Sequence, residues 1–181
     1  MPEQSTPTSN ATLNRLRAAV LGANDGIVST ASVLMGVAGA SAGSRALFTA
    51  GMAALVAGAL SMAVGEYVSV SSQRDAEKVN SKLAEEHEDG EFTNPWQAAI
   101  ASLLAFTAGG LVPFVAVLAA PEDIQILATV IAVVVALVFT GYYSASVGGA
   151  SRKRAIARVM IGGLIAMAVT YFIGAAFGAF V

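Results

Sequence analysis

Residues 58–69 of this chain read GALSMAVGEYVS, and this stretch decides the fold. It continues an apolar run that is long enough to cross a bilayer as a helix. Within it Met62 and Glu66 are four residues apart, which places a thioether and a carboxylate on one helix face. An ionisable side chain inside a membrane helix is costly, and by default it marks an ion path, a proton relay or a substrate site. The stretch therefore predicts a membrane fold and a site within it.

The composition of the whole chain is typical of a membrane protein. Of the 181 residues, 56% are hydrophobic and 12% are charged, and the mean hydropathy is +0.70. A soluble domain carries about twice that charged fraction. The apolar residues form separate blocks, so the sequence predicts an all-α, polytopic membrane protein with five transmembrane helices. The expected segments are a disordered cytoplasmic tail at 1–14, spans at about 15–40, 46–73, 96–119, 124–150 and 155–181, and a short acidic cytoplasmic segment at 75–94.

The positions of Lys and Arg predict the orientation of these spans. Of the ten basic residues, only Arg45 falls on one side of the five-span arrangement, and the other nine fall on the opposite side. Because Lys and Arg are enriched in cytoplasmic loops, the N-terminus is expected in the cytoplasm and the C-terminus outside. No signal peptide or organellar presequence is recognisable, which indicates the inner (plasma) membrane of a bacterium.

The residue types exclude several kinds of chemistry. There are no cysteines, so disulfides, thiolate metal sites and iron–sulfur clusters are excluded. A single His cannot build an imidazole-rich metal site, and a net charge of −2 gives no reason to expect a nucleic-acid partner. The sequence has no nucleophile–base pair and no cofactor motif, so neither an enzyme activity nor a cofactor is expected. Any metal chemistry must use oxygen ligands and methionine sulfur.

Asp25 is the second acidic residue inside the predicted spans. It belongs to a stripe of small and polar residues at helical spacing, which would let another backbone approach closely. Counted from the basic residues Arg15 and Arg74 at about 1.5 Å per residue, Asp25 falls at a depth between Met62 and Glu66. If the faces that carry these side chains meet, two carboxylates and one thioether surround one point near mid-membrane. The stripe consists of Gly22, Asp25, Ser29, Ser32, Gly36 and Gly39, and the last span has a similar small-residue pair, Gly174 and Gly178.

This set of ligands favours some metal ions over others. Mg²⁺ and Ca²⁺ prefer oxygen alone, whereas Fe²⁺, Mn²⁺, Co²⁺ and Zn²⁺ accept mixed oxygen and sulfur ligands. Carboxylates that bind a proton when the metal leaves would permit proton–metal exchange. Two simpler interpretations stay open at this point. Met62 could be a packing residue, and a carboxylate inside the membrane could form a hydrogen bond between helices.

Three segments of the chain resemble the vacuolar iron transporter family. Residues 16–29, LRAAVLGANDGIVS, resemble the first helix of that family, residues 58–69 are similar to its second helix, and residues 94–99, NPWQAA, resemble the start of its third. The resemblance implies a homodimer whose translocation path lies at the dimer interface, lined by the first two helices of both subunits. It also implies that Asp25 and Met62 are the mid-membrane metal ligands, with Glu66 nearby.

The resemblance further implies that Fe²⁺, and often Mn²⁺, leaves the cytosol in exchange for protons. One departure is that the acidic segment at 75–94 is too short for the long cytoplasmic metal-binding domain of the iron-storage members. The chain is therefore more like the short, nodulin-like and bacterial members. Four acidic residues could still attract cations to the mouth of the path, and His87 could assist them, although such a loop is more often only a solvated surface. These residues are Glu77, Glu85, Glu86 and Glu88.

The sequence thus predicts a proton-coupled exporter of Fe²⁺ or Mn²⁺ whose partners are the lipid bilayer, divalent metal ions and a second copy of the chain. A metal-responsive membrane sensor or scaffold without transport is the main alternative. A transporter for a different solute, in which Met62 is only a packing residue, is the third.

Overall fold

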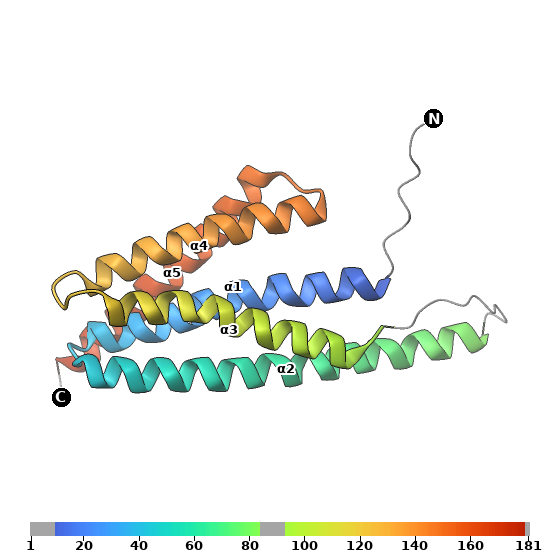
Figure 1. The fold of residues 1–181 in the computed structure, drawn as a ribbon, viewed down its shortest axis with the longest axis horizontal. Helices are drawn as coiled ribbons and strands as arrows, with labels where there is room; N and C mark the ends of the chain where they lie inside the picture. The colour runs from blue at the N-terminus through green and yellow to red at the C-terminus, as the bar shows by residue number, and fades with distance from the viewer. Residues whose placement is uncertain (1–9, 84–92, 180–181) are drawn as a thin grey trace.

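Five long helices form the described part of the chain, which covers residues 10–83 and 93–179 of a computed structural model (Figure 1). They are α1 (Asn10–Gly39), α2 (Ser44–Leu83), α3 (Pro95–Ala119), α4 (Gln125–Gly148) and α5 (Arg152–Gly178). Each contains a segment long and apolar enough to cross a membrane. The described ranges contain no strand. The predicted all-α fold with five transmembrane helices is confirmed.

Three helix boundaries differ from the predicted spans. α1 begins at Asn10, so residues 10–14 extend the helix instead of belonging to the expected tail, of which residues 1–9 lie outside the described part. α2 continues to Leu83, and α5 begins at Arg152. The spans were predicted from the point where apolar residues stop. A helix, however, continues as long as its backbone hydrogen bonds do, and those can extend into polar sequence.

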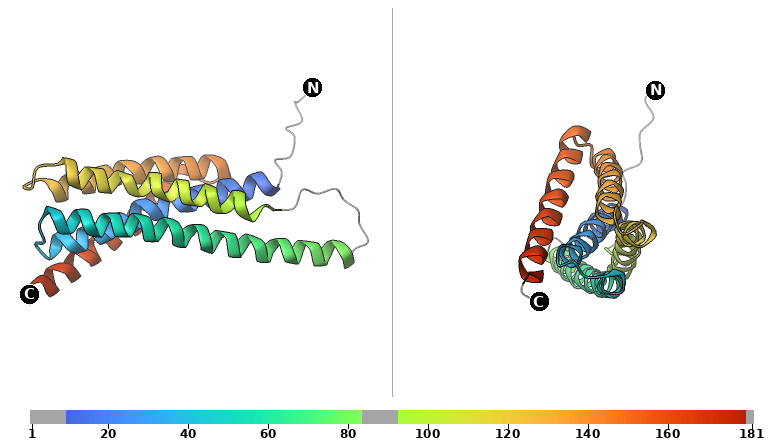
Figure 2. Two further views of the ribbon diagram at one scale, coloured as in Figure 1. Left: turned by 60° about the horizontal axis from the view of Figure 1, so that its bottom comes forward. Right: turned by 90° about the vertical axis from the view of Figure 1, so that its left-hand side faces the viewer.

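α1 lies at the centre of the bundle. It packs against each of the other four helices, whereas α2 packs only against α1 and α3 within the described part of the chain. Figure 2 shows α2 and the α4–α5 hairpin on different sides of α1, with α5 crossing α1 at an angle. The sequence of neighbours around α1 is α2, α3, α4 and α5. Because α2 and α5 do not meet, no helix of the described residues covers the face of α1 between them.

Glycines allow the other helices to approach α1 closely. At Gly26 an added Cβ would overlap a backbone carbonyl of α3. On the opposite side of the bundle, Gly174 of α5 lies against the carbonyl of Gly36, and Gly178 lies against Ala40. The small-residue pair that the sequence indicated in the last span is therefore a packing contact between α5 and α1.

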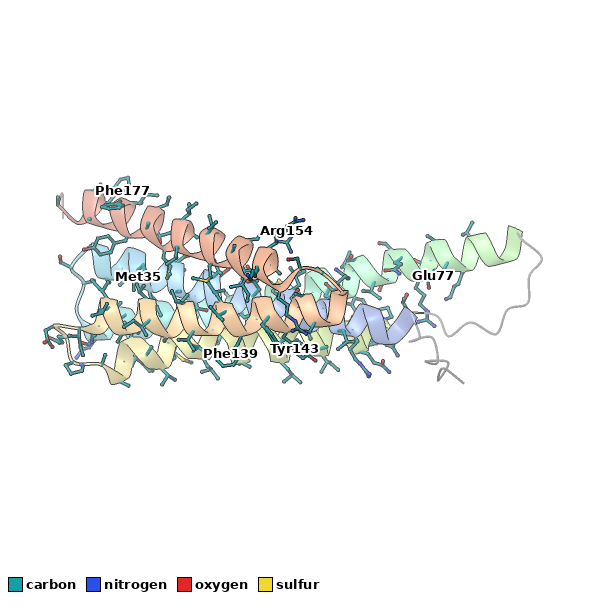
Figure 3. All side chains as sticks on the ribbon, turned by 90° about the horizontal axis from the view of Figure 1, so that it is seen from above. Met35, Glu77, Phe139, Tyr143, Arg154 and Phe177 are labelled. Carbon is teal, nitrogen blue, oxygen red and sulfur yellow. The ribbon has the colours of Figure 1, made fainter. Side chains whose placement is uncertain are left out.

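Large apolar side chains occur both inside the bundle and on its outer surface. One buried cluster joins α1 to α4 and α5 and includes Met35, and a second joins α1, α2 and α3 and includes Phe114. Phe139 and Phe177 instead project outward from α4 and α5 (Figure 3). Exposed apolar surface of this extent is what a helix bundle presents to lipid, as expected for a multi-pass membrane protein.

Candidate functional site

Contacts with α3 fix how α1 and α2 are aligned. The backbone of Phe106 lies against Gly26 of α1, and the ring of the same residue lies against Gly58 of α2. Leu34 of α1 lies 3.1 Å from the Cβ position of Gly51 in α2. The two helices run in opposite directions, so both contacts describe one register, in which position 26 is level with 58 and position 34 is level with about 51.

This register places Asp25 and Met62 close to the same depth. Asp25 is level with residues near position 59 of α2, which is three residues from Met62, or about 4.5 Å along the axis. Side chains lean toward the N-terminus of their own helix, and the two helices are antiparallel, so Asp25 and Met62 lean toward each other's level. The two proposed central ligands therefore belong to one layer of the bundle.

The depth of Asp25 predicted from the sequence needs a correction. The sequence estimate put Asp25 between Met62 and Glu66, but the register puts it beyond Met62, on the side away from Glu66. The estimate assumed that Arg15 and Arg74 mark the same level. In the register of α1 and α2 these two positions are about five residues apart, because α2 continues as a helix far past the apolar run.

Asp25 is half-buried and accepts a hydrogen bond of 2.8 Å from the hydroxyl of Ser29, one turn later on α1. Leu21 lies one turn before Asp25, and Val33 lies one turn after Ser29, so the four residues form one row along α1. Leu21 is 46% exposed and Val33 is 41% exposed. The row therefore lies toward the uncovered face of α1. A carboxylate can accept several hydrogen bonds or bind a cation in addition to one hydroxyl, so the contact with Ser29 is compatible with a ligand role.

Met62 is half-buried on α2, one turn before Glu66. Within residues 10–83 and 93–179, no three Asp, Glu or His side chains come together in a way that could hold a metal ion. The layer of Asp25 and Met62 in one chain thus supplies one carboxylate and one thioether. A transition-metal ion takes four or more ligands, so this layer is only part of a coordination shell.

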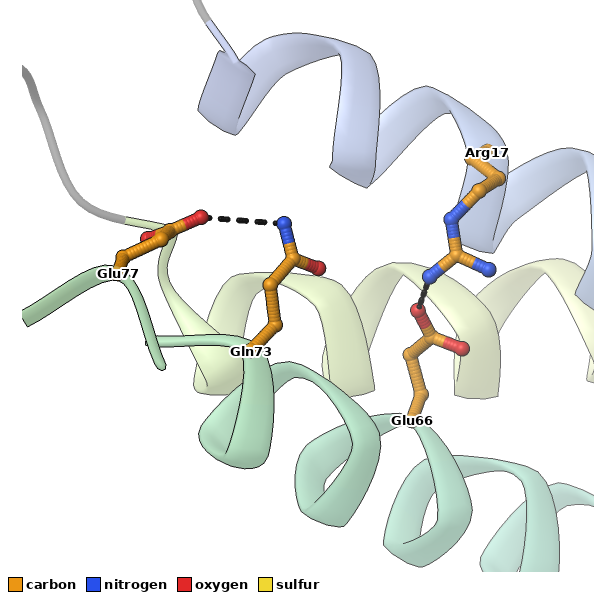
Figure 4. A network of polar contacts seen from close by, with 4 residues as sticks. All are labelled: Arg17, Glu66, Gln73 and Glu77. Carbon is orange, nitrogen blue, oxygen red and sulfur yellow. Dashed lines mark hydrogen bonds and ion pairs between the residues drawn. The ribbon is translucent and has the colours of Figure 1, made fainter. Parts of the chain in front are cut away.

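Glu66 forms an ion pair that the sequence analysis did not anticipate. Its side chain is only 6% exposed, and its Oε1 accepts a hydrogen bond of 2.5 Å from Nη2 of Arg17 on α1 (Figure 4). Arg17 is 51% exposed. The need to neutralise a membrane carboxylate could have indicated a basic partner, and Arg17 is one turn and a half before the Asp25 stripe on the neighbouring helix.

Glu77 accepts hydrogen bonds from neighbouring residues of the protein. Its Oε1 accepts a hydrogen bond of 3.1 Å from Gln73, and its Oε2 accepts bonds of 3.4 and 3.2 Å from the backbone N–H and the hydroxyl of Thr93 (Figure 4 shows the first of these). These bonds fasten the extension of α2 to the residues that precede α3. The other residues predicted to attract metal at the mouth lie outside the described residues; they are Glu85, Glu86, Glu88 and His87.

Three polar side chains on α1 lie outside the proposed ligand set, and of these the sequence analysis had singled out only Ser32, as part of the small-residue stripe. In the described part of the chain, the buried side-chain oxygens of Asn24, Thr30 and Ser32 have no hydrogen-bond partner. Asn24 also lines a cavity of about 420 Å³ between α1, α4 and α5, together with Arg17 and Thr140. Asn24 lies within the quoted LRAAVLGANDGIVS segment and Thr30 follows it directly, but no spacing rule distinguishes these two residues from packing residues.

Comparisons with known proteins agree with the resemblance seen in the sequence. A model described as "VIT family" matches residues 16–89 and 79–175. The chain is 49% identical over 158 residues to Vacuolar iron transporter homolog 2 of Arabidopsis thaliana, which covers 86% of this chain and 81% of that protein. It is 46% identical over 167 residues to Vacuolar iron transporter homolog 5 of Oryza sativa subsp. japonica, covering 87% of this chain and 78% of that protein.

Proposed function

The chain belongs to the VIT family, and from this premise we propose that it exports Fe²⁺ and Mn²⁺ from the cytosol in exchange for protons. A metal transporter role follows from the names of the relatives, which are iron transporter homologues. The observation that carries the finer proposal is the common level of Asp25 and Met62 on two neighbouring helices. Carboxylate oxygen with thioether sulfur suits Fe²⁺ and Mn²⁺ better than Mg²⁺ or Ca²⁺.

The incomplete set of ligands supports a homodimer. Asp25 lies in a row whose ends, Leu21 and Val33, are exposed on the uncovered face of α1. A carboxylate that faces hydrocarbon has a large free-energy cost, so we expect another protein surface to cover this row. A second copy, related by a two-fold axis along the membrane normal, would cover it and would bring a second Asp25 and a second Met62 to the same depth. The metal site would then lie between the two copies.

Proton coupling follows from the chemistry of the same groups. A carboxylate that loses a bound divalent cation inside a membrane can be neutralised by a proton. Asp25 would then alternate between a metal-bound and a protonated state, and the charge buried in the membrane would change less in each cycle. The relatives' names place those proteins at the vacuole, and a bacterial inner membrane stays a prediction for this chain that fractionation of the host cell would test.

The test is uptake of Fe²⁺ and Mn²⁺ into proteoliposomes under an imposed pH gradient. Met62→Leu keeps the side-chain volume but removes the sulfur, and we expect it to reduce uptake at least about tenfold, the loss typical of a metal ligand. Met52→Leu is the matched control, because Met52 lies on the exposed side of the same helix. Light scattering of the detergent-solubilised protein should give twice the chain mass. Equal uptake by both variants would overturn the site, and metal binding without uptake would favour a sensor or scaffold.

A further inference from the structure

The ion pair between Arg17 and Glu66 has an asymmetric environment. The carboxylate of Glu66 is 6% exposed, whereas the side chain of Arg17 is 51% exposed. A buried carboxylate without a nearby cation carries a large desolvation cost, and Arg17 supplies that cation from the neighbouring helix (Figure 4). Breaking the pair therefore costs less free energy for the half-exposed guanidinium, which water can solvate, than for the buried carboxylate of Glu66.

The structure also provides space that Arg17 can occupy when it is not at Glu66. Arg17 lines the cavity of about 420 Å³ between α1, α4 and α5. The polar lining of this cavity includes Asn24 and Ser144. A rotation of the long arginine side chain about its own bonds would move the guanidinium from Glu66 toward these groups without a movement of the helices.

We propose that Arg17 is a built-in competitor for Glu66, so that the binding of a transported metal ion to Glu66 and the pairing of Arg17 with Glu66 exclude each other. This proposal rests on the proposed function, because it assigns Arg17 a part in the same metal path. Oε1 of Glu66 is already bound to the guanidinium. A divalent cation on the same carboxylate would lie within a few ångströms of a positive charge, where repulsion is strong in low dielectric.

The competition gives the empty transporter a defined resting state. While Arg17 holds Glu66, the buried carboxylate is neutralised without a metal ion. When Fe²⁺ or Mn²⁺ arrives from the cytoplasmic end, Arg17 turns away, and Glu66 accepts the metal ion. Arg17 thereby lowers the affinity of Glu66 for metal and aids release of the ion to the deeper layer of Asp25 and Met62. It is a positioning residue of the path and not itself a ligand.

The experiment measures Mn²⁺ binding to the purified full-length chain in detergent, followed by the electron paramagnetic resonance signal of unbound Mn²⁺. Arg17→Gln removes the competing charge, and we expect the Kd for Mn²⁺ to fall about fivefold, the change that matches a partly exposed ion pair. Arg17→Lys retains a cation and should stay within about twofold of the parent. Arg17→Gln combined with Glu66→Gln should bind Mn²⁺ no more tightly than Glu66→Gln alone.

Arg15→Gln is the matched control, since it makes the same change of charge two residues away at an exposed position. Its Kd should equal that of the parent. Should Arg17→Gln fail to fold, Arg17→Met removes the charge and keeps the aliphatic stem, with the same expected tightening. A role of Arg17 in stability alone predicts weaker binding in both neutral variants, which is the opposite sign.

Several results would overturn the proposal. They are an unchanged or higher Kd in the folded neutral variants, an equal tightening in Arg15→Gln, and a tightening that persists when Glu66 is already Gln. A parent chain that binds no Mn²⁺ contradicts the proposed function itself. Mn²⁺ binding and transport that Arg17→Gln leaves unchanged contradict only the competition at Glu66.

Discussion

At the scale of single residues, the acidic side chains of α1 and α2 differ in what surrounds them. Asp25 is bonded to a hydroxyl of its own helix, Glu66 is paired with Arg17, and Glu77 accepts bonds from two segments of the chain. A carboxylate therefore belongs to a candidate metal layer in one case, to an ion pair in the second, and to hydrogen bonds that join α2 to the start of α3 in the third.

Glu77 gives a prediction about stability. Thr93 is 1% exposed, and both its N–H and its hydroxyl donate to Glu77. Glu77→Ala leaves these buried donors without that acceptor, so we expect the free energy of unfolding to fall by about 1–2 kcal/mol. Thermal unfolding in detergent, followed by the fluorescence of Trp96, measures the change. Asp75→Ala, at an exposed position of the same helix, should leave the transition in place.

The alternative is that Glu77 collects metal at the mouth of the path, as the sequence suggested. In that case Glu77→Ala would weaken uptake at low Mn²⁺ concentration and leave the unfolding temperature unchanged. A normal unfolding transition combined with reduced uptake would therefore contradict the structural role.

At the scale of the helices, the close packing of α5 on α1 depends on Gly174. A Cβ at this position would overlap the carbonyl of Gly36, which cannot move without shifting α1. We expect Gly174→Ala to destabilise the fold by about 1–3 kcal/mol, as overpacking does. Gly162→Ala on the same helix is the control, since no described residue beyond the adjacent backbone of α5 lies within 4 Å of the added Cβ. Retention of the folded peak in size-exclusion chromatography after heating compares the two.

The changes in the free energy of unfolding of the two alanine variants should differ in sign as well as in size. Alanine favours a helix over glycine by about 1 kcal/mol, so Gly162→Ala should stabilise the protein slightly. If Gly174→Ala survives heating as well as Gly162→Ala does, the close approach of α5 to α1 is not as the structure has it.

The helices could be predicted from the sequence because their signal is strong and local. Apolar runs of more than 20 residues have no other stable state in a bilayer than a helix, so the order and number of the spans followed directly. The N-cap of α3 was equally local, and Asn94 accepts from the N–H groups of Trp96 and Gln97. The register of α1 against α2 was not predictable, because it is set by contacts through α3 at Gly26, Gly58 and Phe106.

In the candidate site, too, local features could be predicted from the sequence and contacts between helices could not. Asp25, Met62 and Glu66 could be named from residue type and spacing, since an ionisable group in an apolar helix is rare. The need for a basic partner of Glu66 could be inferred, but Arg17 could not be identified as that partner, because the two residues are 49 positions apart and belong to different helices. Nor could the fastening role of Glu77, since its partner Thr93 is brought close only when α3 packs against α2.

At the scale of the whole molecule, the distribution of basic residues predicts the order in which a metal ion would meet the proposed ligands. The start of α1, the end of α2 and the start of α5 lie at the same end of the bundle (Figure 1), and nine of the ten basic residues lie in these parts of the three helices. By the preference of Lys and Arg for the cytoplasm, this end is predicted to be cytoplasmic. Metal would then meet Glu66 first and Asp25 with Met62 deeper in the membrane, in the order that the register gives.

The most direct measurement of the central claim records Mn²⁺ and H⁺ together in the same proteoliposomes, with one dye for each ion. We predict that Mn²⁺ added on the side of the basic residues enters while H⁺ leaves, and that collapse of the pH gradient slows the entry of Mn²⁺. Asp25→Asn, which keeps the shape but removes the charge, should abolish both movements. Entry of Mn²⁺ without any movement of H⁺, or paired movements that persist in Asp25→Asn, would contradict proton-coupled export through this site.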